Sequence, residues 1–322
     1  MEGIINVLKP PGMTSSDVVV RMRRVLKTKK IGHTGTLDPG AAGVLPLCVG
    51  KATRLAEYIT EQGKAYLAEV SFGVTTDTQD AFGKKIYETR PNLKQSDLER
   101  VLPKFLGEIS QAPPMYSAVR KEGKRLYEYA RQGLSVERKS RKVFIYSLKV
   151  VKWYEEEFPR AILYIECSKG TYIRTISHDL GQVLGCGAHM SFLLRVCSGK
   201  FKIRESWTLE EIEEAVNKSN YVFLLPLTAG IDLQRVFLSA ARANAFRHGL
   251  PTDAGFVDRG LWLEDPSLLC KDRSAQSETI SSVRTTNIEP RTTSYVQVIE
   301  EGKLIGIGIW REEGLFPYKV LG

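Results

Sequence analysis

The sequence contains few cysteines and histidines, and their scarcity excludes two classes of protein. Its 322 residues include five scattered cysteines and four histidines, with no CxxC, CxxH or HxxxH spacing. An odd number of scattered cysteines argues against a disulfide framework and is typical of a protein in a reducing cytoplasm. Because structural and catalytic metals need clustered ligands, we expect no metal site.

Long hydrophobic runs are also missing. No apolar stretch approaches the ~18 residues that a membrane helix needs, and the first residues, MEGIINVLKPPG, lack the basic and apolar regions of a secretory signal. Hydrophobic residues nevertheless make up 43% of the chain and charged residues 26%, which excludes general disorder. We therefore expect a soluble, cytoplasmic protein without a membrane partner, and at about 150 residues per domain the length predicts two domains.

The net charge of +9 is concentrated in two segments. Residues 14–30 contain six lysines and arginines against one aspartate, and residues 120–142 contain nine against three glutamates. Two basic segments on a nearly neutral background favour a polyanionic partner, most simply a nucleic acid. Charge alone leaves open the alternative of a basic surface that only faces solvent.

The hydrophobic pattern predicts helices and strands in an irregular order. Residues 3–8 and 66–73 are typical of strands, and Tyr66 lies on the apolar face of the second one. Capping residues and helical spacing predict helices that begin after Ser15 or Ser16, at the capping-box pattern 96–99, and after Thr208. Because there is no regular βαβ alternation, the fold class is predicted to be α+β.

The composition changes after about residue 230. Residues 266–295 are rich in Ser, Thr and Arg and lack periodicity, so we expect a loop or a disordered insert there. The segment YVQVIEEGKLIGIGIW that overlaps its end has two alternating runs around a Glu-Glu-Gly-Lys turn, which predicts a β-hairpin. A small β domain in the C-terminal part of the chain is consistent with this pattern.

The glycine-rich segment 31–43, IGHTGTLDPGAAG, is predicted to be a long loop and is the densest candidate for a functional site. It belongs to neither common phosphate-binding motif, because GxGxxG is absent and Gly50-Lys51 lacks the flanking residues of a Walker loop. Within it, Asp38 stands in a Leu-Asp-Pro-Gly turn. Asp38 could merely begin the turn, or it could present a carboxylate nucleophile to a substrate that approaches over the glycines.

A carboxylate nucleophile in a dry site needs a nearby cation to remain ionised. Arg174 is the candidate, because it lies two residues after Tyr172 in a stretch predicted to be extended, so that both side chains share one side. Each residue also has an ordinary alternative: a surface arginine, a core tyrosine at Tyr66 and a loop histidine at His33. Together they form a consistent site for a planar base, with the basic segments along a phosphate backbone.

The segment GHTGTLDPGAAGVLP (32–46) resembles the TruB family of bacterial tRNA pseudouridine-55 synthases. Further segments resemble motifs of this family in the same order and extend the resemblance over roughly residues 3–230. These segments are KPPGMTSSD (9–17), Lys64-Ala65-Tyr66 followed by Thr76-Asp77-Thr78 and Asp80, PPMYSAVRKEGKRLYEYARQG (113–133), SKGTYIRTISHDLG (168–181) and CGAHMSFLLR (186–195).

The resemblance implies a fold and a division into domains. A catalytic domain of pseudouridine-synthase type with a mixed, mainly antiparallel sheet is expected over residues 1–230, with an RNA-contacting insert near 113–142. A small PUA-like β domain that binds RNA is expected over residues 231–322, with a flexible segment at 266–295. The chain has Leu193-Leu194-Arg195 where the family usually has Leu-Arg-Arg, which predicts the loss of one basic RNA contact.

The resemblance also implies roles for single residues. Asp38 matches the catalytic aspartate, Arg174 the arginine paired with it, and Asp77 a second acidic residue that holds this arginine. Tyr66 matches the tyrosine that stacks on the target uracil and is proposed as a proton acceptor. The other implied contacts with the nucleotide or the RNA are His33, which fills the space of the flipped nucleotide, Tyr172, Leu193, Lys9, Arg120, Lys121, Lys124 and Arg125.

The activity that the resemblance implies is the isomerisation of uridine 55 to pseudouridine in the T-loop of tRNA, by base flipping and without a cofactor. The implied partner is the T-arm of tRNA, with no obligatory protein, so a monomer that also assists tRNA folding is expected. Two alternatives are a tRNA-binding protein whose main task is folding, and a guide-RNA-dependent synthase in a ribonucleoprotein. The presence of Asp38 with Tyr66 and Arg174 favours catalysis over mere binding, and the insert at 113–133 favours a stand-alone enzyme.

Overall fold

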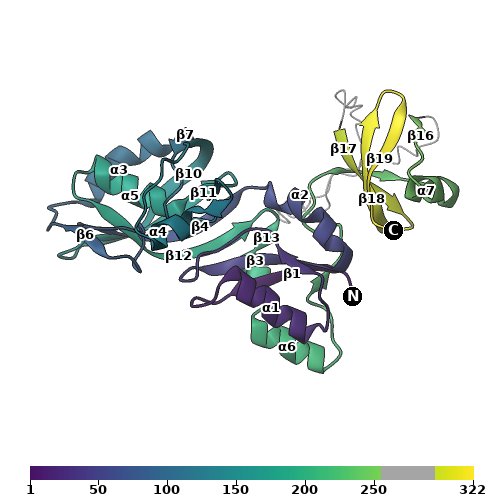
Figure 1. Cartoon of the computed structure of the whole chain (residues 1–322), viewed down its shortest axis with the longest axis horizontal. Helices are drawn as coiled ribbons and strands as arrows, with labels where there is room; N and C mark the ends of the chain where they lie inside the picture. Colours follow the sequence, from purple (N-terminus) through teal and green to yellow (C-terminus); the bar gives the residue numbers. More distant parts are fainter. Residues whose placement is uncertain (255–293) are drawn as a thin grey trace, which may run out of the picture. The chain divides into compact units, whose positions relative to one another are not determined.

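The computed structural model describes residues 1–254 and 294–322, which form two compact units. The first unit comprises Met1–Gly230 and the second Ile231–Gly322 (Figure 1). None of the helices in the described part of the chain combines the length and the apolar character needed to cross a lipid bilayer.

The first unit is built on one large sheet. Its strands follow the order β14-β1-β3-β12-β4-β11-β10-β7, with β2 beside β3 and β13 beside β12. Neighbours along this path are antiparallel except for β3 and β12, which pair in parallel. The strands are β1 (Gly3–Lys9), β2 (Ile31–His33), β3 (Ala42–Val49), β4 (Lys64–Phe72), β7 (Gly107–Gln111), β10 (Arg141–Tyr154), β11 (Arg160–Cys167), β12 (Ala188–Ser198), β13 (Phe201–Lys202) and β14 (Leu224–Leu225). The predicted α+β class with a mixed, mainly antiparallel sheet is confirmed.

Two groups of helices pack against different parts of this sheet. The pair α1 (Ser15–Val25) and α6 (Leu209–Asn217) lies near β1, whereas α3 (Gln95–Val101) and α5 (Ile173–Val183) lie near β10 and β12 (Figure 1). The shorter helical segments are η1 (Gly50–Leu55), α2 (Ala56–Thr60), η2 (Leu102–Phe105), α4 (Leu126–Arg131) and η3 (Ile203–Glu205). Two small hairpins, β5 (Val74–Thr76) with β6 (Lys85–Glu88) and β8 (Arg120–Lys121) with β9 (Lys124–Arg125), extend from the sheet's connections.

Strand β4 shows how the sequence pattern becomes a buried face. Tyr66, Ala68, Val70 and Phe72 are buried, whereas the residues between them are partly exposed, as the alternation predicts. In an antiparallel sheet, successive side chains point to opposite faces. The apolar face of β4 therefore enters the main core, and Tyr66 is carried with it.

Helix starts were predicted less well than helix positions. Thr14, not Ser15 or Ser16, caps α1 through a reciprocal capping box with Asp17, whereas the buried Ser15 hydroxyl contacts Leu37. Helix α3 begins at Gln95, with Asp97 accepting a hydrogen bond from the Lys94 amide, so the predicted capping box at 96–99 is wrong. The predicted capping box of Thr208 and Glu211 at the start of α6 is confirmed.

The second unit has its own sheet and its own hydrophobic core. The sheet order is β15-β17-β18-β19-β16, and α7 packs beside β16 and β19. Its elements are β15 (Gln234–Phe237), α7 (Ala240–Arg247), β16 (Thr252–Asp253), β17 (Ser294–Glu300), β18 (Lys303–Arg311) and β19 (Gly314–Val320). The predicted hairpin is confirmed as β17 and β18. Of the segment 266–295, predicted to be flexible, Ser294 and Tyr295 belong to β17 and the rest lies outside the described residues.

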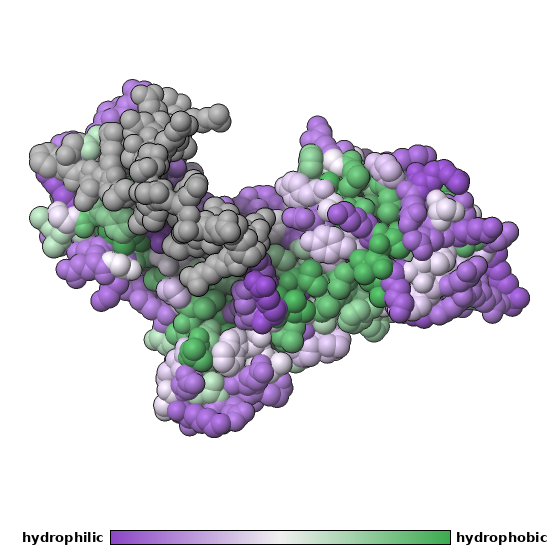
Figure 2. Space-filling view, turned by 180° about the vertical axis from the view of Figure 1, so that it is seen from behind, coloured by the Kyte–Doolittle hydropathy of each residue, from purple (hydrophilic) through white to green (hydrophobic). Residues whose placement is uncertain are grey.

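The surface of the first unit is not uniformly polar. Figure 2 shows hydrophobic residues gathered over the middle of this unit, with hydrophilic residues over one end. Single exposed apolar side chains are normal on a soluble protein. An exposed aromatic ring therefore suggests a binding role only where it lies beside a cleft that could hold a ligand.

Candidate active site

The loop between β2 and β3, residues 34–41, is shorter than the predicted loop 31–43 and is fixed at several points. The buried Ser15 hydroxyl accepts a hydrogen bond from the Leu37 amide at 2.9 Å and donates one to the Leu37 carbonyl at 3.2 Å. The Gly12 amide donates to the Pro39 carbonyl at 2.8 Å, and the Ala41 amide donates to the Asp38 carbonyl at 3.0 Å. Asp38 thus begins a turn, as the ordinary alternative predicts, and that turn is held rigidly.

Lys9 lies beneath this loop, and the prediction that it contacts RNA is wrong. It is fully buried, and its ammonium donates to the carbonyls of Pro10, Met13 and Pro39 at 2.8, 2.6 and 3.3 Å. Burial lowers the pKa of Lys9 to about 8, an effect that the nearby Asp38 partly opposes. Lys9 therefore joins the N-terminal segment to the loop that carries Asp38.

Arg195 is the second buried cation beneath the loop, a role that the sequence did not predict. From β12 its guanidinium donates to the carbonyls of Val44, Gly35 and Thr36 at 2.7, 3.1 and 3.5 Å. It is almost completely buried. A signal was present in the sequence, because an arginine in an apolar strand must find several acceptors if it faces the core.

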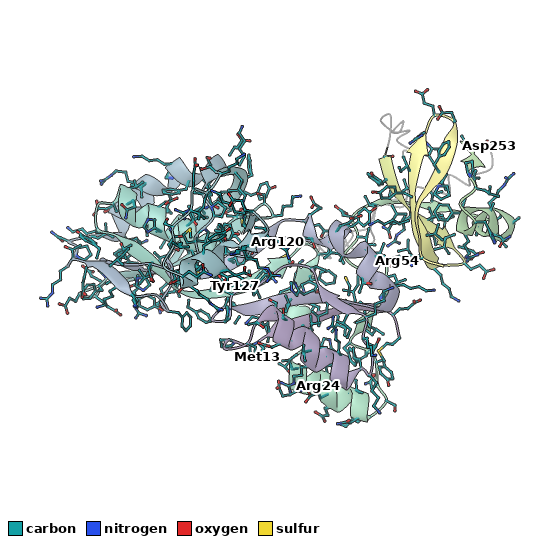
Figure 3. All side chains as sticks on the ribbon, viewed as in Figure 1. Met13, Arg24, Arg54, Arg120, Tyr127 and Asp253 are labelled. Carbon is teal, nitrogen blue, oxygen red and sulfur yellow. The ribbon has the colours of Figure 1, made fainter. Side chains whose placement is uncertain are left out.

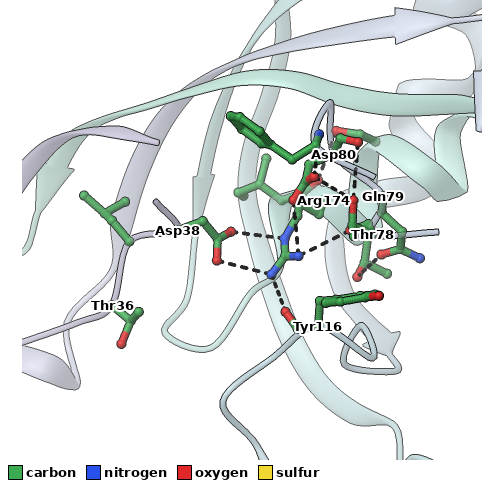
Figure 4. Close-up of polar contacts among 12 residues, drawn as sticks. Thr36, Asp38, Thr78, Gln79, Asp80, Tyr116 and Arg174 are labelled. Atoms are coloured by element: carbon green, nitrogen blue, oxygen red, sulfur yellow. Dashed lines mark hydrogen bonds and ion pairs between the residues drawn. The ribbon is translucent and has the colours of Figure 1, made fainter. Parts of the chain in front are cut away.

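Asp38 and Arg174 form a two-point ion pair (Figure 4). Arg174 Nε lies 3.1 Å from Asp38 Oδ2, and Nη2 lies 3.3 Å from Oδ1. The Arg174 side chain is buried, whereas 38% of the Asp38 side chain is exposed. The predicted cation is thus beside the predicted carboxylate, and the carboxylate is the partner that faces the opening.

The second carboxylate on Arg174 belongs to Asp80, so the prediction that Asp77 holds this arginine is wrong. Arg174 Nη1 lies 3.4 Å from Asp80 Oδ2 and 3.3 Å from the Thr78 carbonyl, and Nη2 donates to the Tyr116 carbonyl at 2.9 Å (Figure 4). Asp77 is exposed, and its Oδ1 accepts a hydrogen bond from the Lys84 amide. The tight turn at 77–83 directs these two carboxylates to different partners.

The surroundings of Asp38 shift its pKa upward from the ordinary value. Burial raises the pKa of Asp38, Arg174 opposes this rise, and the Asp80 carboxylate adds to it. Burial also raises the pKa of Tyr66 to about 12, with Arg195 opposing the rise. Tyr66 is therefore a neutral phenol at neutral pH, and it can stack or hydrogen-bond but is a poor proton acceptor.

Tyr172 and Arg174 do not lie in an extended stretch, so that part of the prediction is wrong. Tyr172 is the N-cap residue of α5, and Arg174 lies in the first turn of the helix. The buried Gln111 fixes Tyr172 by accepting from its amide at 3.0 Å and donating to its carbonyl at 3.2 Å. The guanidinium of Arg141 lies over the Tyr172 ring, 4.6 Å from its centre. The sequence predicted neither of these contacts, because Gln111 and Arg141 are distant from Tyr172 in the chain.

His33 and Leu193 line the same cleft as Asp38. Burial and the nearby Arg195 lower the pKa of His33, so its imidazole is neutral at neutral pH. Its Nδ1 atom has no hydrogen-bond partner within the described part of the chain. Leu193 is buried on β12, opposite Ala68 of β4. The walls of the site are therefore largely apolar.

The predicted RNA-contacting insert forms the hairpin of β8 and β9 followed by α4. Arg120, Lys124 and Arg125 are exposed, whereas the ammonium of Lys121 donates to the Glu137 carbonyl at 2.9 Å. Arg120 and Tyr127 lie in one region of the molecule (Figure 3), and both line the cleft. The guanidinium groups of Arg125 and Arg131 lie 5.9 and 5.2 Å from the centre of the Tyr127 ring. The insert thus adds cations and an aromatic ring to the cleft.

These residues surround one cleft of about 1280 Å³. Asp38, Arg174, Tyr66, Tyr172, His33 and Leu193 line it, together with Arg120 and Arg125 from the insert. Its volume is larger than that of most small-molecule sites, which are roughly 300–1,000 Å³. A carboxylate with a buried cation at its base, apolar walls and a basic rim suits a nucleotide within a larger nucleic acid.

Comparison with known protein families gives two matches. Residues 23–173 match the model described as TruB family pseudouridylate synthase (N terminal domain), and residues 174–231 match that described as tRNA pseudouridylate synthase B C-terminal domain. The tRNA pseudouridine synthase B of Symbiobacterium thermophilum is 52% identical over 252 residues, which are 78% of this chain and 83% of that protein. The protein of the same name from Streptococcus sanguinis is 48% identical over 254 residues, which are 77% of this chain and 87% of that protein.

Solved structures share the fold at low sequence identity. A chain from a Cbf5-Nop10-Gar1 complex has a TM-score of 0.70 and 23% identity, and the match covers 99% of this chain and 85% of that chain. A chain from an H/ACA ribonucleoprotein bound to a substrate RNA containing 2'-deoxyuridine has a TM-score of 0.69 with the same identity and coverage. At this identity the similarity shows the fold alone.

Proposed function

The chain belongs to the TruB family of pseudouridine synthases, and from this premise we propose that it converts uridine 55 in the T-loop of tRNA to pseudouridine. Relatives named tRNA pseudouridine synthase B support tRNA as the substrate class. The observation that carries the proposal is the Asp38–Arg174 pair, whose carboxylate faces the cleft while its guanidinium is buried. We also propose that the enzyme acts as a monomer.

The reaction redistributes bonds within one nucleotide. The bond between C1′ and N1 breaks and a bond between C1′ and C5 forms, while C5 loses a proton and N1 gains one. Substrate and product have the same formula, so the bond changes themselves require no cosubstrate. Asp38 attacks C1′ or C6, or promotes a glycal intermediate, and the detached uracil turns before it rejoins the sugar.

Base flipping brings the target to Asp38 at a cost of a few kcal/mol. The neutral imidazole of His33 fills the vacated space by stacking and offsets part of this cost. Tyr66 provides an aromatic surface beneath the uracil, and Leu193 helps to keep water from the intermediate. Because the pKa of Tyr66 is raised to about 12, we assign it stacking rather than proton acceptance.

Arg174 keeps Asp38 ionised and oriented, and Asp80 orients Arg174. The exposed cations of the β8–β9 hairpin bind the phosphates of the T-arm. The second unit contributes further RNA contacts as a PUA-like domain. We also propose that flipping the bases of the T-arm and releasing them assists tRNA folding.

The direct test is incubation of the purified protein with an unmodified tRNA transcript, followed by base-resolved detection of pseudouridine. We expect one signal, at uridine 55. Asp38→Asn should abolish turnover and leave tRNA affinity within a few-fold, because it removes the carboxylate and keeps the shape of the site. Asp253→Asn, which alters an exposed carboxylate of the second unit, is the matched control and should behave as wild type.

Three outcomes would contradict parts of the proposal. A signal at another uridine would exclude position 55 as the target. Substantial turnover by Asp38→Asn would remove Asp38 from the nucleophile role. Tight tRNA binding without any pseudouridine would favour the alternative of a protein that mainly assists tRNA folding.

A further inference from the structure

Phe82 carries an unusually exposed aromatic ring. Its exposed fraction of 79% is the highest among the large hydrophobic residues in the described part of the chain. It lies in the turn between β5 and β6, two residues after Asp80. Exposure of an apolar phenyl ring to water costs free energy. A ring exposed beside a cleft therefore suggests that a ligand covers it when bound.

The ring lies at the edge of the cleft, against the loop that carries Asp38. A Cβ atom added to Gly40 would fall 2.1 Å from Phe82 Cε2 and 2.6 Å from Cζ, so the ring packs directly on the Gly40 backbone. Both residues line the cleft. Any residue larger than glycine at position 40 would displace the ring.

The backbone of Phe82 is fixed by the carboxylate that also holds Arg174. The Phe82 amide donates to Asp80 Oδ1 at 3.0 Å, and the Thr78 hydroxyl donates to the same oxygen at 2.6 Å. Asp80 Oδ2 lies 3.4 Å from Arg174 Nη1. The Met190 amide of β12 donates to the Gln79 carbonyl at 3.0 Å and joins the turn to the main sheet. The ring is therefore held in a defined place relative to the catalytic pair.

The ring and Tyr66 lie at different depths. Tyr66 is buried on β4, in the floor of the site, whereas the Cε2 and Cζ atoms of Phe82 lie against Gly40 and most of the ring is open. A uracil that reaches Asp38 and stacks on Tyr66 leaves the outer ring free. An aromatic ring at the edge of a cleft lined by arginines suits an unpaired base of an RNA, because each base has a face that can stack.

We propose that Phe82 is a substrate-binding residue that stacks on the base of a nucleotide adjacent to the target uridine. This inference rests on the proposed function, since it requires an RNA whose target nucleotide is in the cleft. Stacking on the neighbour orients the chain that enters the site and does not take part in bond changes. The ligand recognised is an unpaired nucleobase next to the target. Stacking does not read the hydrogen-bonding groups of this base, so any of the four bases can occupy the position.

The test uses the full chain and a T-arm stem-loop RNA, in single-turnover reactions at varied protein concentration. Phe82→Ala should raise the half-saturating concentration about tenfold and change the maximal rate less than threefold. This is within the range of about 5- to 150-fold that corresponds to the loss of one base–aromatic stack. Phe82→Trp should retain affinity, and Phe82→Leu, which keeps an apolar contact with Gly40 but cannot stack, should resemble Phe82→Ala. Phe144→Ala, an exposed phenylalanine of β10 outside the cleft lining, should behave as wild type.

An abasic RNA identifies the stacked partner. With an abasic site at one of the two nucleotides that flank the target, wild type and Phe82→Ala should bind equally, because the partner base is gone. The proposal is overturned if Phe82→Ala binds the intact RNA as tightly as wild type, if Phe82→Leu keeps full affinity, or if the loss persists on both abasic RNAs.

The same series separates this inference from the proposed function. If wild type forms pseudouridine at the target and Phe82→Ala has no defect, the function stands and the stacking role fails. If wild type forms none, the function fails, and equilibrium binding of the intact and abasic RNAs by wild type and Phe82→Ala still decides whether the ring stacks.

Discussion

The guanidinium of Arg174 contacts the carboxylates of both Asp38 and Asp80, and these two carboxylates differ in exposure to solvent. The side chain of Asp38 is 38% exposed, whereas that of Asp80 is 14% exposed and engaged with its own turn. A nucleophile must reach its substrate, so this difference supports our proposal that Asp38 is the reacting group and Asp80 a positioning residue. Both carboxylates are needed to hold one buried cation at a fixed angle.

The pH dependence of the reaction should report this arrangement. As the proposed nucleophile, Asp38 reacts in its carboxylate form, and its pKa is raised above the ordinary 3.8 by burial and, in part, by Asp80. Activity should therefore fall as the pH falls through a value above 3.8. Asp80→Asn removes a negative charge near Asp38 and should move this fall in activity, the acid limb of the pH profile, to lower pH. Its kcat should also fall at least about tenfold, because Arg174 loses a group that orients it. The profile of kcat against pH measures both effects.

Asp77→Asn is the control for this change. Asp77 lies in the same turn, is exposed and accepts a hydrogen bond only from the Lys84 amide among the described contacts. We expect its acid limb and kcat to match those of wild type. If Asp77→Asn moved the acid limb and Asp80→Asn did not, the assignment of Asp80 as the positioning residue would be incorrect.

At the scale of elements, the catalytic loop depends on strand β12 as much as on its own turn. Arg195 reaches from β12 to the carbonyls of Val44, Gly35 and Thr36 and so joins both ends of the loop 34–41. Gly43 makes this approach possible, because its φ is +116° and a Cβ atom there would fall 2.2 Å from the Arg195 carbonyl oxygen. The position of Asp38 is thus set by a parallel strand pair.

Arg195→Met should destabilise the protein by about 3 kcal/mol, since buried carbonyls lose their donor. Its kcat should fall on the order of 100-fold through misplacement of Asp38. Arg195→Lys restores the charge but reaches fewer carbonyls and should be intermediate in both respects. Urea unfolding and single-turnover kinetics measure the two effects. Arg204→Met, which alters an exposed arginine of η3, should leave the free energy of unfolding and kcat unchanged. If Arg204→Met lost as much stability and activity as Arg195→Met, the effect would come from removing charge in general.

The β8–β9 hairpin is the element expected to hold phosphates. Replacing Arg120, Lys124 and Arg125 by alanine should weaken tRNA binding and reduce the slope of log Kd against log salt by about two to three. The physical reason is that each phosphate contact releases condensed counterions on binding. Binding titrations at several salt concentrations give the slope directly.

The matched control removes three cations elsewhere on the first unit. Three exposed cations outside the cleft lining serve this purpose: Lys94, the N-cap residue of α3, Arg100 of α3 and Lys104 of η2. Their replacement by alanine should leave the slope nearly unchanged. An equal reduction by both triple variants would mean that net charge, rather than the hairpin, determines the salt dependence.

At the scale of the whole molecule, each unit has a core of its own, and the described site lies entirely in the first. A chain that ends at Gly230 should therefore unfold cooperatively and keep its maximal single-turnover rate within about threefold. Because we propose that the second unit contacts RNA, its removal should raise the half-saturating tRNA concentration by roughly tenfold. Urea unfolding and single-turnover kinetics test this; unchanged affinity would exclude the second unit from RNA binding.

The sequence predicted the site in part, and its failures have a common origin. Local patterns were sufficient for the alternation of β4, the capping box of α6 and the C-terminal hairpin. Lys9 and Asp77 were misassigned because a charged residue type does not reveal which partner it will meet. Arg195 and Gln111 were overlooked because their partners lie far away in sequence, across strands and a helix start.

The amino-acid sequence by itself determined the α+β class, the family and the set of residue types in the cleft, because these follow from composition, periodicity and motifs that are local in the chain. Only the tertiary structure decided that Asp80 rather than Asp77 meets Arg174, that Lys9 lies under the loop and that Phe82 rests on Gly40. These contacts join segments up to 94 residues apart. Their geometry depends on sheet register and turn conformation, since one residue of displacement turns a side chain to the opposite face.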